Sequence, residues 1–184
     1  MVARDTDSNW IQTYSGLPYW PANPRVEDVR LEDIAHGLSM LCRYAGQTRK
    51  FFSVAEHCVH VSHLVPPELA LEGLLHDASE AYCSDIVRPL KQVLPGYKRV
   101  EARNMAVIRE KFGLPPKEHP LVKKADTSIL LVELKDLLPP FAQGYTFGVT
   151  DRMQTPVCKI YGWNPREAEI FFLDRFHEIT KDWS

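Results

Sequence analysis

Apolar residues recur at three- and four-residue spacing in several long segments of this 184-residue chain, and proline or glycine separates each segment from the next. This spacing puts the apolar side chains on one face of an α-helix, and that face is buried against other helices. No segment shows the apolar–polar alternation that is typical of a series of β-strands. We therefore predict an all-α fold, a single helical bundle of about six helices. The helices are expected at residues 31–46, 53–64, 66–82, 97–112, 120–138 and 164–181.

Certain residues indicate where these helices begin and where the chain is irregular. Ser53, with Glu56 three positions later, is the pattern of a capping box, and Asn164 followed by proline predicts a helix start. Pro89 is expected to break the chain between two helices. The segments expected to be irregular are a loose tail at 1–9, an aromatic arm at 10–24 with a short strand at 10–14, and the longest loop at 143–156.

Length and composition limit the class of protein. A chain of this length suits one domain, because single cores usually serve about 100–200 residues, and we predict a single domain over residues 1–184. The net charge of -2 argues against a nucleic-acid polymer as the main partner, since that binding needs many Lys and Arg contacts to phosphates. None of the four cysteines lies in a C-x-x-C pair. With no recognisable signal peptide and no run near the roughly 20 apolar residues that span a membrane, a cytoplasmic protein is expected.

Histidine and carboxylate side chains occur at positions that could hold a cation. His76 and Asp77 are adjacent, and Glu80 follows one helical turn later on the same face. His57 lies in the preceding helix and Asp126 in a later one. Two histidines and two carboxylates from three helices are a common cation site in helical bundles, and mixed nitrogen and oxygen ligands suit Mn, Co, Fe or Zn. Judged by spacing alone, ordinary packed or solvated histidines remain the alternative.

Three stretches of the chain carry these residues in order: Ser53-Val54-Ala55-Glu56-His57, Leu74-Leu75-His76-Asp77-Ala78-Ser79-Glu80-Ala81 and Lys124-Ala125-Asp126. Together they resemble the HD-domain metal-dependent phosphohydrolases, whose signature is the ordered pattern H…HD…D. The continuation through Asp85 to Lys91 resembles the bacterial 5'-deoxynucleotidases and the compact phage enzymes that hydrolyse dATP. The opening, from Trp20 to His36, is closer to the compact phage members. The resemblance covers roughly residues 10–138.

The resemblance implies one divalent transition metal ion, with Co, Mn or Zn as the first choices and Mg as a further choice. Glu80 resembles the carboxylate that orients or deprotonates the attacking water. Asp85 resembles the acid placed near the leaving 5' oxygen, with capping of the following segment as its alternative role. The implied metal ligands are His57, His76, Asp77 and Asp126.

The same resemblance implies four substrate-binding residues. Arg43 resembles the arginine that holds the phosphate, where its planar guanidinium offers two parallel donors. Lys91 resembles a lysine that contacts the phosphate. Tyr44 and Pro89 lie where related enzymes contact the nucleoside, although the family often has tryptophan in place of Tyr44.

The implied reaction is hydrolysis at the α-phosphorus of a deoxynucleotide, which releases the nucleoside. dATP or a related purine dNTP is the favoured substrate, and a 5'-deoxynucleotidase acting on dNMPs is the alternative. A cyclic-nucleotide or alarmone phosphodiesterase is a further alternative, although the Gly-Tyr-Pro motif of cyclic-dinucleotide enzymes is absent. A non-catalytic nucleotide-binding module is the last alternative, and Glu80 argues against it. Related enzymes form homo-oligomers, so a dimer to hexamer without membrane attachment is expected, in a bacterial or phage-infected cell.

Other polar residues carry plainer expectations. His60 is expected near the cation site and His63 in solvent. His36 is expected to be buried with a structural hydrogen bond. Lys50 is expected either in a solvated turn or facing an anionic substrate. Trp20 is expected in the core or at a subunit contact, with a place near the substrate entrance as the alternative.

Overall fold

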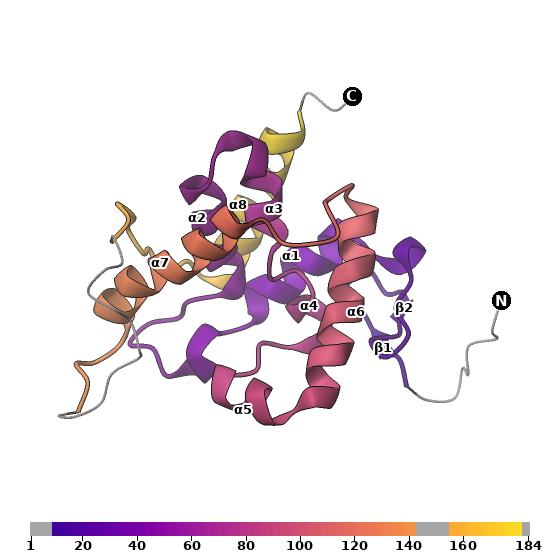
Figure 1. The fold of residues 1–184 in the computed structure, drawn as a ribbon, viewed down its shortest axis with the longest axis horizontal. Helices are drawn as coiled ribbons and strands as arrows, with labels where there is room; N and C mark the ends of the chain where they lie inside the picture. Colours follow the sequence, from indigo (N-terminus) through magenta and orange to yellow (C-terminus); the bar gives the residue numbers. More distant parts are fainter. Residues whose placement is uncertain (1–8, 143–154, 182–184) are drawn as a thin grey trace.

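The computed structural model describes residues 9–142 and 155–181, and helices dominate it, as the all-α prediction requires (Figure 1). One two-stranded antiparallel sheet occurs in these residues, in the predicted N-terminal arm. No helix of the described part is long and apolar enough to cross a membrane. The elements are β1 (Ile11–Gln12), β2 (Pro18–Tyr19), η1 (Val26–Asp28), α1 (Leu31–Met40), η2 (Arg43–Gly46), α2 (Val54–Leu64), η3 (Pro67–Leu69), α3 (Ala70–Leu75), α4 (Glu80–Cys83), α5 (Arg88–Val93), α6 (Pro95–Lys111), α7 (Pro120–Leu137) and α8 (Pro165–Thr180).

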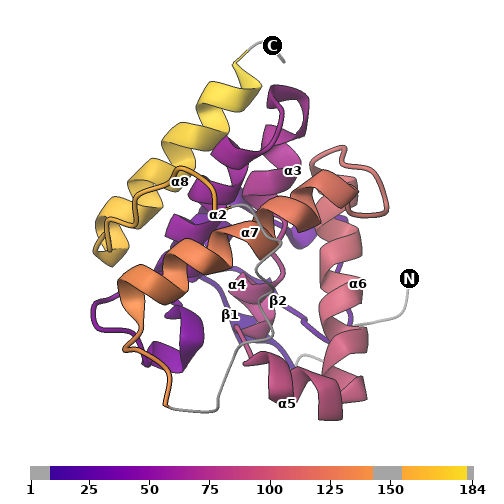
Figure 2. The same cartoon turned by 60° about the vertical axis from the view of Figure 1, so that its left-hand side comes forward.

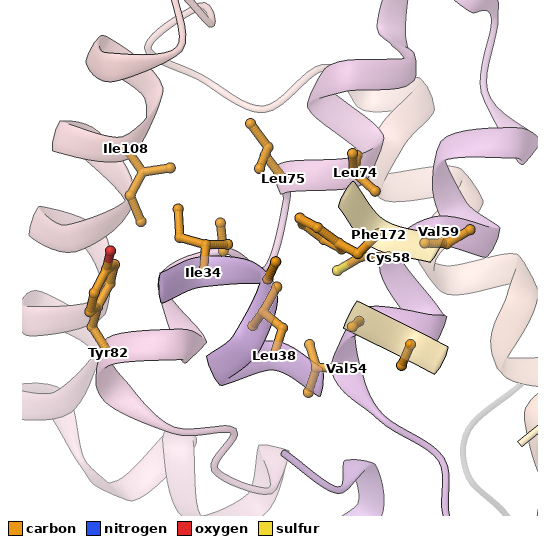
Figure 3. Close-up of a cluster of buried hydrophobic side chains, with 14 of the residues drawn as sticks. Ile34, Leu38, Val54, Cys58, Val59, Leu74, Leu75, Tyr82, Ile108 and Phe172 are labelled. Atoms are coloured by element: carbon orange, nitrogen blue, oxygen red, sulfur yellow. The ribbon is translucent and has the colours of Figure 1, made fainter. Parts of the chain in front are cut away.

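The main core lies around α1, where apolar side chains from α2, α3, α6 and α8 meet (Figure 3). Ile34 and Leu38 of α1 are fully buried, as are Leu74 of α3 and Phe172 of α8. Each such side chain contributes about 1.5–3 kcal/mol when it is removed from water. The periodicity that predicts these helices therefore also identifies the faces that form the core.

Helix α7 packs across α2 through a smaller apolar cluster (Figure 2). Val61 of α2 and Ile129 of α7 are fully buried in it, next to Val122 and Ala125. Asp126 directly follows Ala125 in the chain, so this packing brings the carboxylate of α7 to the helix that carries His57.

A buried ion pair fixes the start of α7. Oε1 of Glu72, in α3, accepts hydrogen bonds from Nη1 and Nη2 of Arg109 at 3.0 Å each and from the backbone N–H of His119 at 2.8 Å. His119 is the N-cap of α7. Removing one partner of such a buried pair leaves an uncompensated charge. The pair therefore fixes the N-terminus of α7 relative to α3.

The predicted helix at 66–82 is wrong in one respect, because it is interrupted at His76–Ser79. Helix α3 ends at Leu75, and α4 begins at Glu80. Between them the backbone forms three-residue turns, such as Glu80 N–H to Asp77 O at 2.9 Å. A continuous helix would use the Gly73 carbonyl for the N–H of Asp77, but this carbonyl accepts from Nδ1 of His76 at 2.8 Å. Competition from the imidazole explains the break.

The first predicted helix also ends early, at Met40 rather than Gly46. Cys42 is extended and pairs with Ser53, and Val54 N–H bonds Leu41 O at 3.0 Å. Backbone groups at 41–42 thus find partners across the chain instead of along a helix.

Among the predictions that rest on single residues, those for Pro89 and for the Ser53–Glu56 box need correction, and the one for Asn164 is confirmed. Pro89 does not break the chain; it lies in the first turn of α5, where a missing N–H costs no helical hydrogen bond. Ser53 caps α2, but Glu56 bonds a distant segment instead of completing the box. Asn164 and Glu167 form the full capping box of α8. Residues 1–8 of the predicted tail and 143–154 of the predicted loop lie outside the described residues.

Gly37 generates a prediction for stability. A Cβ at this position of α1 would lie 2.9 Å from Ala81 Cβ of α4, and 3.1 Å from its Cα. Gly37→Ala should therefore destabilise the protein by about 1–3 kcal/mol, as overpacking does, and lower its Tm by several degrees. Gly96→Ala is the control, because a Cβ there meets nothing nearer than 3.9 Å and alanine favours the helix. Equal Tm values for the two variants would refute the close approach of α1 and α4.

Candidate metal centre

Four side chains from α2, the turn after α3, and α7 converge at one point. Nε2 of His57 lies 3.2 Å from Nε2 of His76 and 3.3 Å from Oδ1 of Asp126. Oδ2 of Asp77 lies 3.2 Å from Nε2 of His76 and 3.8 Å from Nε2 of His57. The structure thus brings together all four residues that the sequence indicates as ligands. The ligand atoms of His57, His76 and Asp126 lie close enough together to hold one ion, and Asp77 meets this set through the two imidazoles.

The hydrogen bonds of the two imidazoles test whether these residues fit a cation. Nδ1 of His76 donates to the Gly73 carbonyl, and Nδ1 of His57 lies 2.6 Å from Oε1 of Glu133. Because both acceptors take a proton from Nδ1, the two Nε2 atoms face each other at 3.2 Å, and, against the effect of burial, Asp77 raises the pKa of His76. That arrangement is unfavourable unless a proton or cation lies between them, and a metal-bound histidine uses this pattern of outer hydrogen bonds. The four residues could therefore hold a metal ion.

The two aspartates are in the form that binds a cation. Burial opposes ionisation of Asp77, but the adjacent His76 outweighs it and holds the pKa of Asp77 well below its usual range. Burial likewise opposes ionisation of Asp126, whose pKa is kept low by His57, His76 and Lys123. Two nitrogen and two carboxylate ligands suit a first-row transition ion better than calcium.

Cys58 lies on the other side of His76 and is a poorer ligand. Its Sγ is 3.9 Å from Nδ1 of His76, which already donates to a backbone carbonyl. Burial raises the pKa of the Cys58 thiol, and metals bind the thiolate. A set of Cys58, His76 and Asp77 is close enough to hold an ion. A cation is nevertheless expected at Nε2 of His76 rather than at Nδ1, because Nδ1 and the Cys58 thiol both carry protons.

Glu133 is a site residue that the sequence interpretation missed. It is fully buried, and its two oxygens meet His57, Arg43 and the hydroxyl of Tyr44. Burial opposes its ionisation, but Arg43 and His57 lower its pKa to about 2. A signal was present, since Glu133 follows Asp126 by seven residues, which is two turns on the same face of one helix. Its apolar neighbours made it resemble a core position.

Arg43 and Tyr44 border the site from η2. Nη1 of Arg43 lies 3.5 Å from Oδ2 of Asp77, and Nη2 lies 3.4 Å from Oε2 of Glu133. Nε of Arg43 is buried without a hydrogen-bond partner in the described residues. Tyr44 has φ 56, and Ala45 has φ 51, which is the left-handed region that costs energy for residues with a Cβ. This conformation turns the Tyr44 hydroxyl inward to Glu133.

Glu80 lies beside the cluster with one oxygen paired. Its Oε1 accepts from Nζ of Lys91 at 2.8 Å, whereas Oε2 is buried and has no hydrogen-bond partner within the described part of the chain. Burial, with the negative charges of Asp77 and Asp85, raises the pKa of Glu80 to about 8 against the effect of Lys91. Glu80 therefore keeps one oxygen without a partner among the described residues, and its carboxyl exchanges a proton near pH 8.

The remaining predicted site residues lie in the segment that runs from the end of α4 through α5. Asp85 follows α4, is half-buried, and has its pKa raised by burial. Nζ of Lys91 also lies 2.7 Å from Oε1 of Glu101, so the lysine joins two carboxylates. Pro89 is exposed in the first turn of α5.

Other histidines and Lys50 have structural contacts. His36 is half-exposed and its Nδ1 lies 3.0 Å from Glu169. His60 is buried and its ring stacks on Trp163, and none of its described contacts is with the four candidate ligands, so the structure does not support the expected place near the cation site; His63 is exposed as predicted. Lys50 donates to the Ile160 and Tyr161 carbonyls, a role that neither of the two expectations for this lysine included. Trp20 is half-buried.

Comparisons with known proteins identify relatives of similar length. The chain is 41% identical over 174 residues to the uncharacterized protein YfdR of Escherichia coli strain K12, covering 94% of this chain and 97% of the relative. It is 34% identical over 192 residues to an uncharacterized protein, RCAP_rcc00048, of Rhodobacter capsulatus, covering 95% of this chain and 97% of the relative. No family model matches the chain.

Glu133 generates a prediction for metal affinity. Glu133→Gln removes the anion that orients His57, and we expect about 10–100-fold weaker binding of Co or Zn, as other outer-shell substitutions produce. Isothermal titration of metal-free protein measures the Kd. Asp136→Asn is the matched control, because Asp136 lies on the same helix but is exposed. Equal Kd values for both variants would contradict the orienting role.

Cation binding should also stabilise the fold. A ligand that binds only the folded state at a hundred times its Kd adds about 2.7 kcal/mol, which is a Tm increase of roughly 5–10 °C for a chain of this size. Asp126→Ala should abolish most of this increase, because it removes one carboxylate ligand. Thermal unfolding with and without Co, Mn or Zn measures it. An unchanged increase in Asp126→Ala would place the cation elsewhere.

Proposed function

The chain belongs to the YfdR family, and we propose that it is a divalent-metal-dependent phosphohydrolase that attacks the α-phosphorus of deoxynucleotides and releases the nucleoside. The observation that carries this proposal is the cluster of two imidazoles and two carboxylates, beside which Glu80 presents a buried, unpartnered oxygen. The resemblance to HD-domain phosphohydrolases supports it independently, through the ordered H…HD…D residues.

A bound divalent cation, with Co, Mn or Zn as first choices and Mg as a further one, lowers the pKa of water and draws charge from phosphoryl oxygens. His57, His76, Asp77 and Asp126 would hold it. The protein itself then has to position groups and neutralise charge, which is most of what phosphoryl transfer requires.

Glu80 and Asp85 would carry the proton transfers. The free Oε2 of Glu80 suits a group that orients a water or accepts its proton. As the water oxygen bonds to phosphorus, the bond from phosphorus to the 5' oxygen breaks. That 5' oxygen takes a proton, for which Asp85 would be the donor; burial raises the pKa of its carboxyl above the usual value.

Arg43 would hold the phosphate. Its guanidinium lies between Asp77 and Glu133, with a buried Nε that lacks a partner among the described residues. A planar fork with a spare donor suits phosphate oxygens. Tyr44 and Pro89 would lie on the nucleoside side, although the Tyr44 hydroxyl already bonds Glu133.

The favoured substrate is dATP or a related purine dNTP, with triphosphate as the second product. This preference rests on the resemblance to the compact phage enzymes. A catalytic role is favoured over a nucleotide-binding module, because a binding module needs no water-activating carboxylate such as Glu80. The protein is expected to act as a homo-oligomer, as related enzymes do.

A 5'-deoxynucleotidase acting on dNMPs is the second candidate, and the pairing of nearby cations favours it. Lys91 contacts two carboxylates, and Nζ of Lys123 lies 2.6 Å from Asp126. These ammonium groups are already neutralised, whereas a triphosphate brings more negative charge than a monophosphate. Nε of Arg43 is a further donor, which has no hydrogen-bond partner among the described residues and could bind one phosphate.

Product analysis with metal-free protein tests both candidates. The protein is re-supplied with Co, Mn, Zn or Mg and offered dATP, dGTP, dAMP and dGMP in parallel. Deoxyadenosine and triphosphate from dATP, with slow cleavage of dAMP, identify a triphosphohydrolase; faster cleavage of monophosphates identifies a 5'-deoxynucleotidase. Asp77→Ala should lose about a hundredfold or more of kcat, since it removes a metal ligand and a neighbour of Arg43.

Two results would overturn the proposal. One is the absence of nucleotide cleavage with every metal, which would favour a binding module. The other is full activity of Asp77→Ala, which would place the reaction away from this cluster.

A further inference from the structure

We infer that Lys91 is a positioning residue for Glu80, held in place by Glu101, and does not bind the substrate phosphate. This inference rests on the proposed function, because it assigns a role within the same reaction. It departs from the resemblance, in which a lysine at this position contacts the phosphate.

The surroundings of the Lys91 ammonium carry the inference. Nζ lies 2.8 Å from Oε1 of Glu80 and 2.7 Å from Oε1 of Glu101. It also lies 5.6 Å from the centre of the Tyr97 ring, whose face attracts a cation. Two short charge-assisted hydrogen bonds and one aromatic face surround a group with three N–H donors. A phosphate could reach only the third N–H, beside two carboxylates that already neutralise the ammonium.

Helix α6 makes this arrangement stable. Tyr97, in its first turn, donates its hydroxyl to the Ser84 carbonyl at 2.5 Å, which ties α6 to the end of α4. Glu101 follows Tyr97 by one helical turn, so both side chains face Lys91. The ammonium is thus approached from α4 by Glu80 and from α6 by Glu101. Helix α5 itself buries none of its residues, so these contacts fix its orientation.

The consequence for Glu80 is geometric. Because Oε1 is occupied by Lys91, the carboxylate cannot rotate freely, and Oε2 stays buried with no partner in the described residues. Asp77 and Asp85 bring further negative charge to this region, and Lys91 offsets it. Lys91 therefore acts on the reaction through Glu80, and Glu101 acts through Lys91.

A double-mutant cycle on Lys91 and Glu80 separates positioning from phosphate binding. Parent, Lys91→Met, Glu80→Gln and the double variant are assayed with the nucleotide that the parent cleaves. We expect Lys91→Met to lower kcat about 10–100-fold with KM within about twofold, because an interaction through the base affects only the chemical step. In the Glu80→Gln background the same substitution should change kcat less than about threefold.

Glu101→Gln provides a second test that leaves Lys91 in place. It should lower kcat about 3–10-fold without raising KM, because the ammonium is then held from one side only. Glu110→Gln is the matched control, an exposed glutamate on the same helix, and should leave kcat and KM unchanged. Circular dichroism and Tm identify any variant that fails to fold, and Glu101→Gln then decides the question if Lys91→Met is lost.

The outcomes distinguish this inference from the proposed function. A tenfold or greater rise in KM for Lys91→Met, of equal size in the Glu80→Gln background, would show a phosphate contact and overturn the inference alone. Normal kinetics of Glu101→Gln in a folded protein would do the same. A parent that cleaves no nucleotide with any metal would overturn the proposed function and this inference with it.

Discussion

The two imidazole Nε2 atoms facing each other at 3.2 Å are the constraint on which the rest of the site depends. They face each other because Glu133 and the Gly73 carbonyl hold the ring protons on the opposite nitrogens. Each of those acceptors belongs to a different element, so α3, α7 and α2 must keep their relative positions for the pair to persist. The apolar packing of α7 on α2 and the Glu72–Arg109 pair supply that rigidity.

Concentrating charged groups here is costly, and the structure offsets the cost by pairing. Several kcal/mol are lost for each ion taken from water unless partners compensate. Glu133 has the imidazole of His57, the guanidinium of Arg43 and the hydroxyl of Tyr44 as partners. Tyr44 reaches Glu133 only from a strained left-handed backbone. The strain at this position accompanies a hydrogen bond to the buried carboxylate that also contacts His57.

Most of the fold could be predicted from the sequence, because periodicity and caps are local signals. The start of α8 at Pro165 and the end of α7 at Leu137 follow from them. The break after Leu75 could not be predicted, since it depends on the His76 ring taking a backbone carbonyl. Glu133 was missed because its partners lie 76 and 89 residues away, and its seven-residue spacing from Asp126 was the one local sign of its role. The four candidate ligand positions could be predicted because each lies in a short stretch that matches one part of an ordered motif.

Helix α6 carries none of the candidate ligands, yet its contacts position residues on two sides of the cluster. Glu101, near its start, holds Lys91 against Glu80. Asn104, one turn later, accepts from the Tyr19 hydroxyl at 2.7 Å and so ties down the N-terminal arm. Arg109, near its end, fixes Glu72 and through it the start of α7, the helix that carries Asp126. Because these contacts lie on one rigid helix, a shift of α6 would move the Glu80 side and the Asp126 side of the cluster together. The distance of Glu80 from Asp126 therefore depends on a helix that carries none of the candidate site residues.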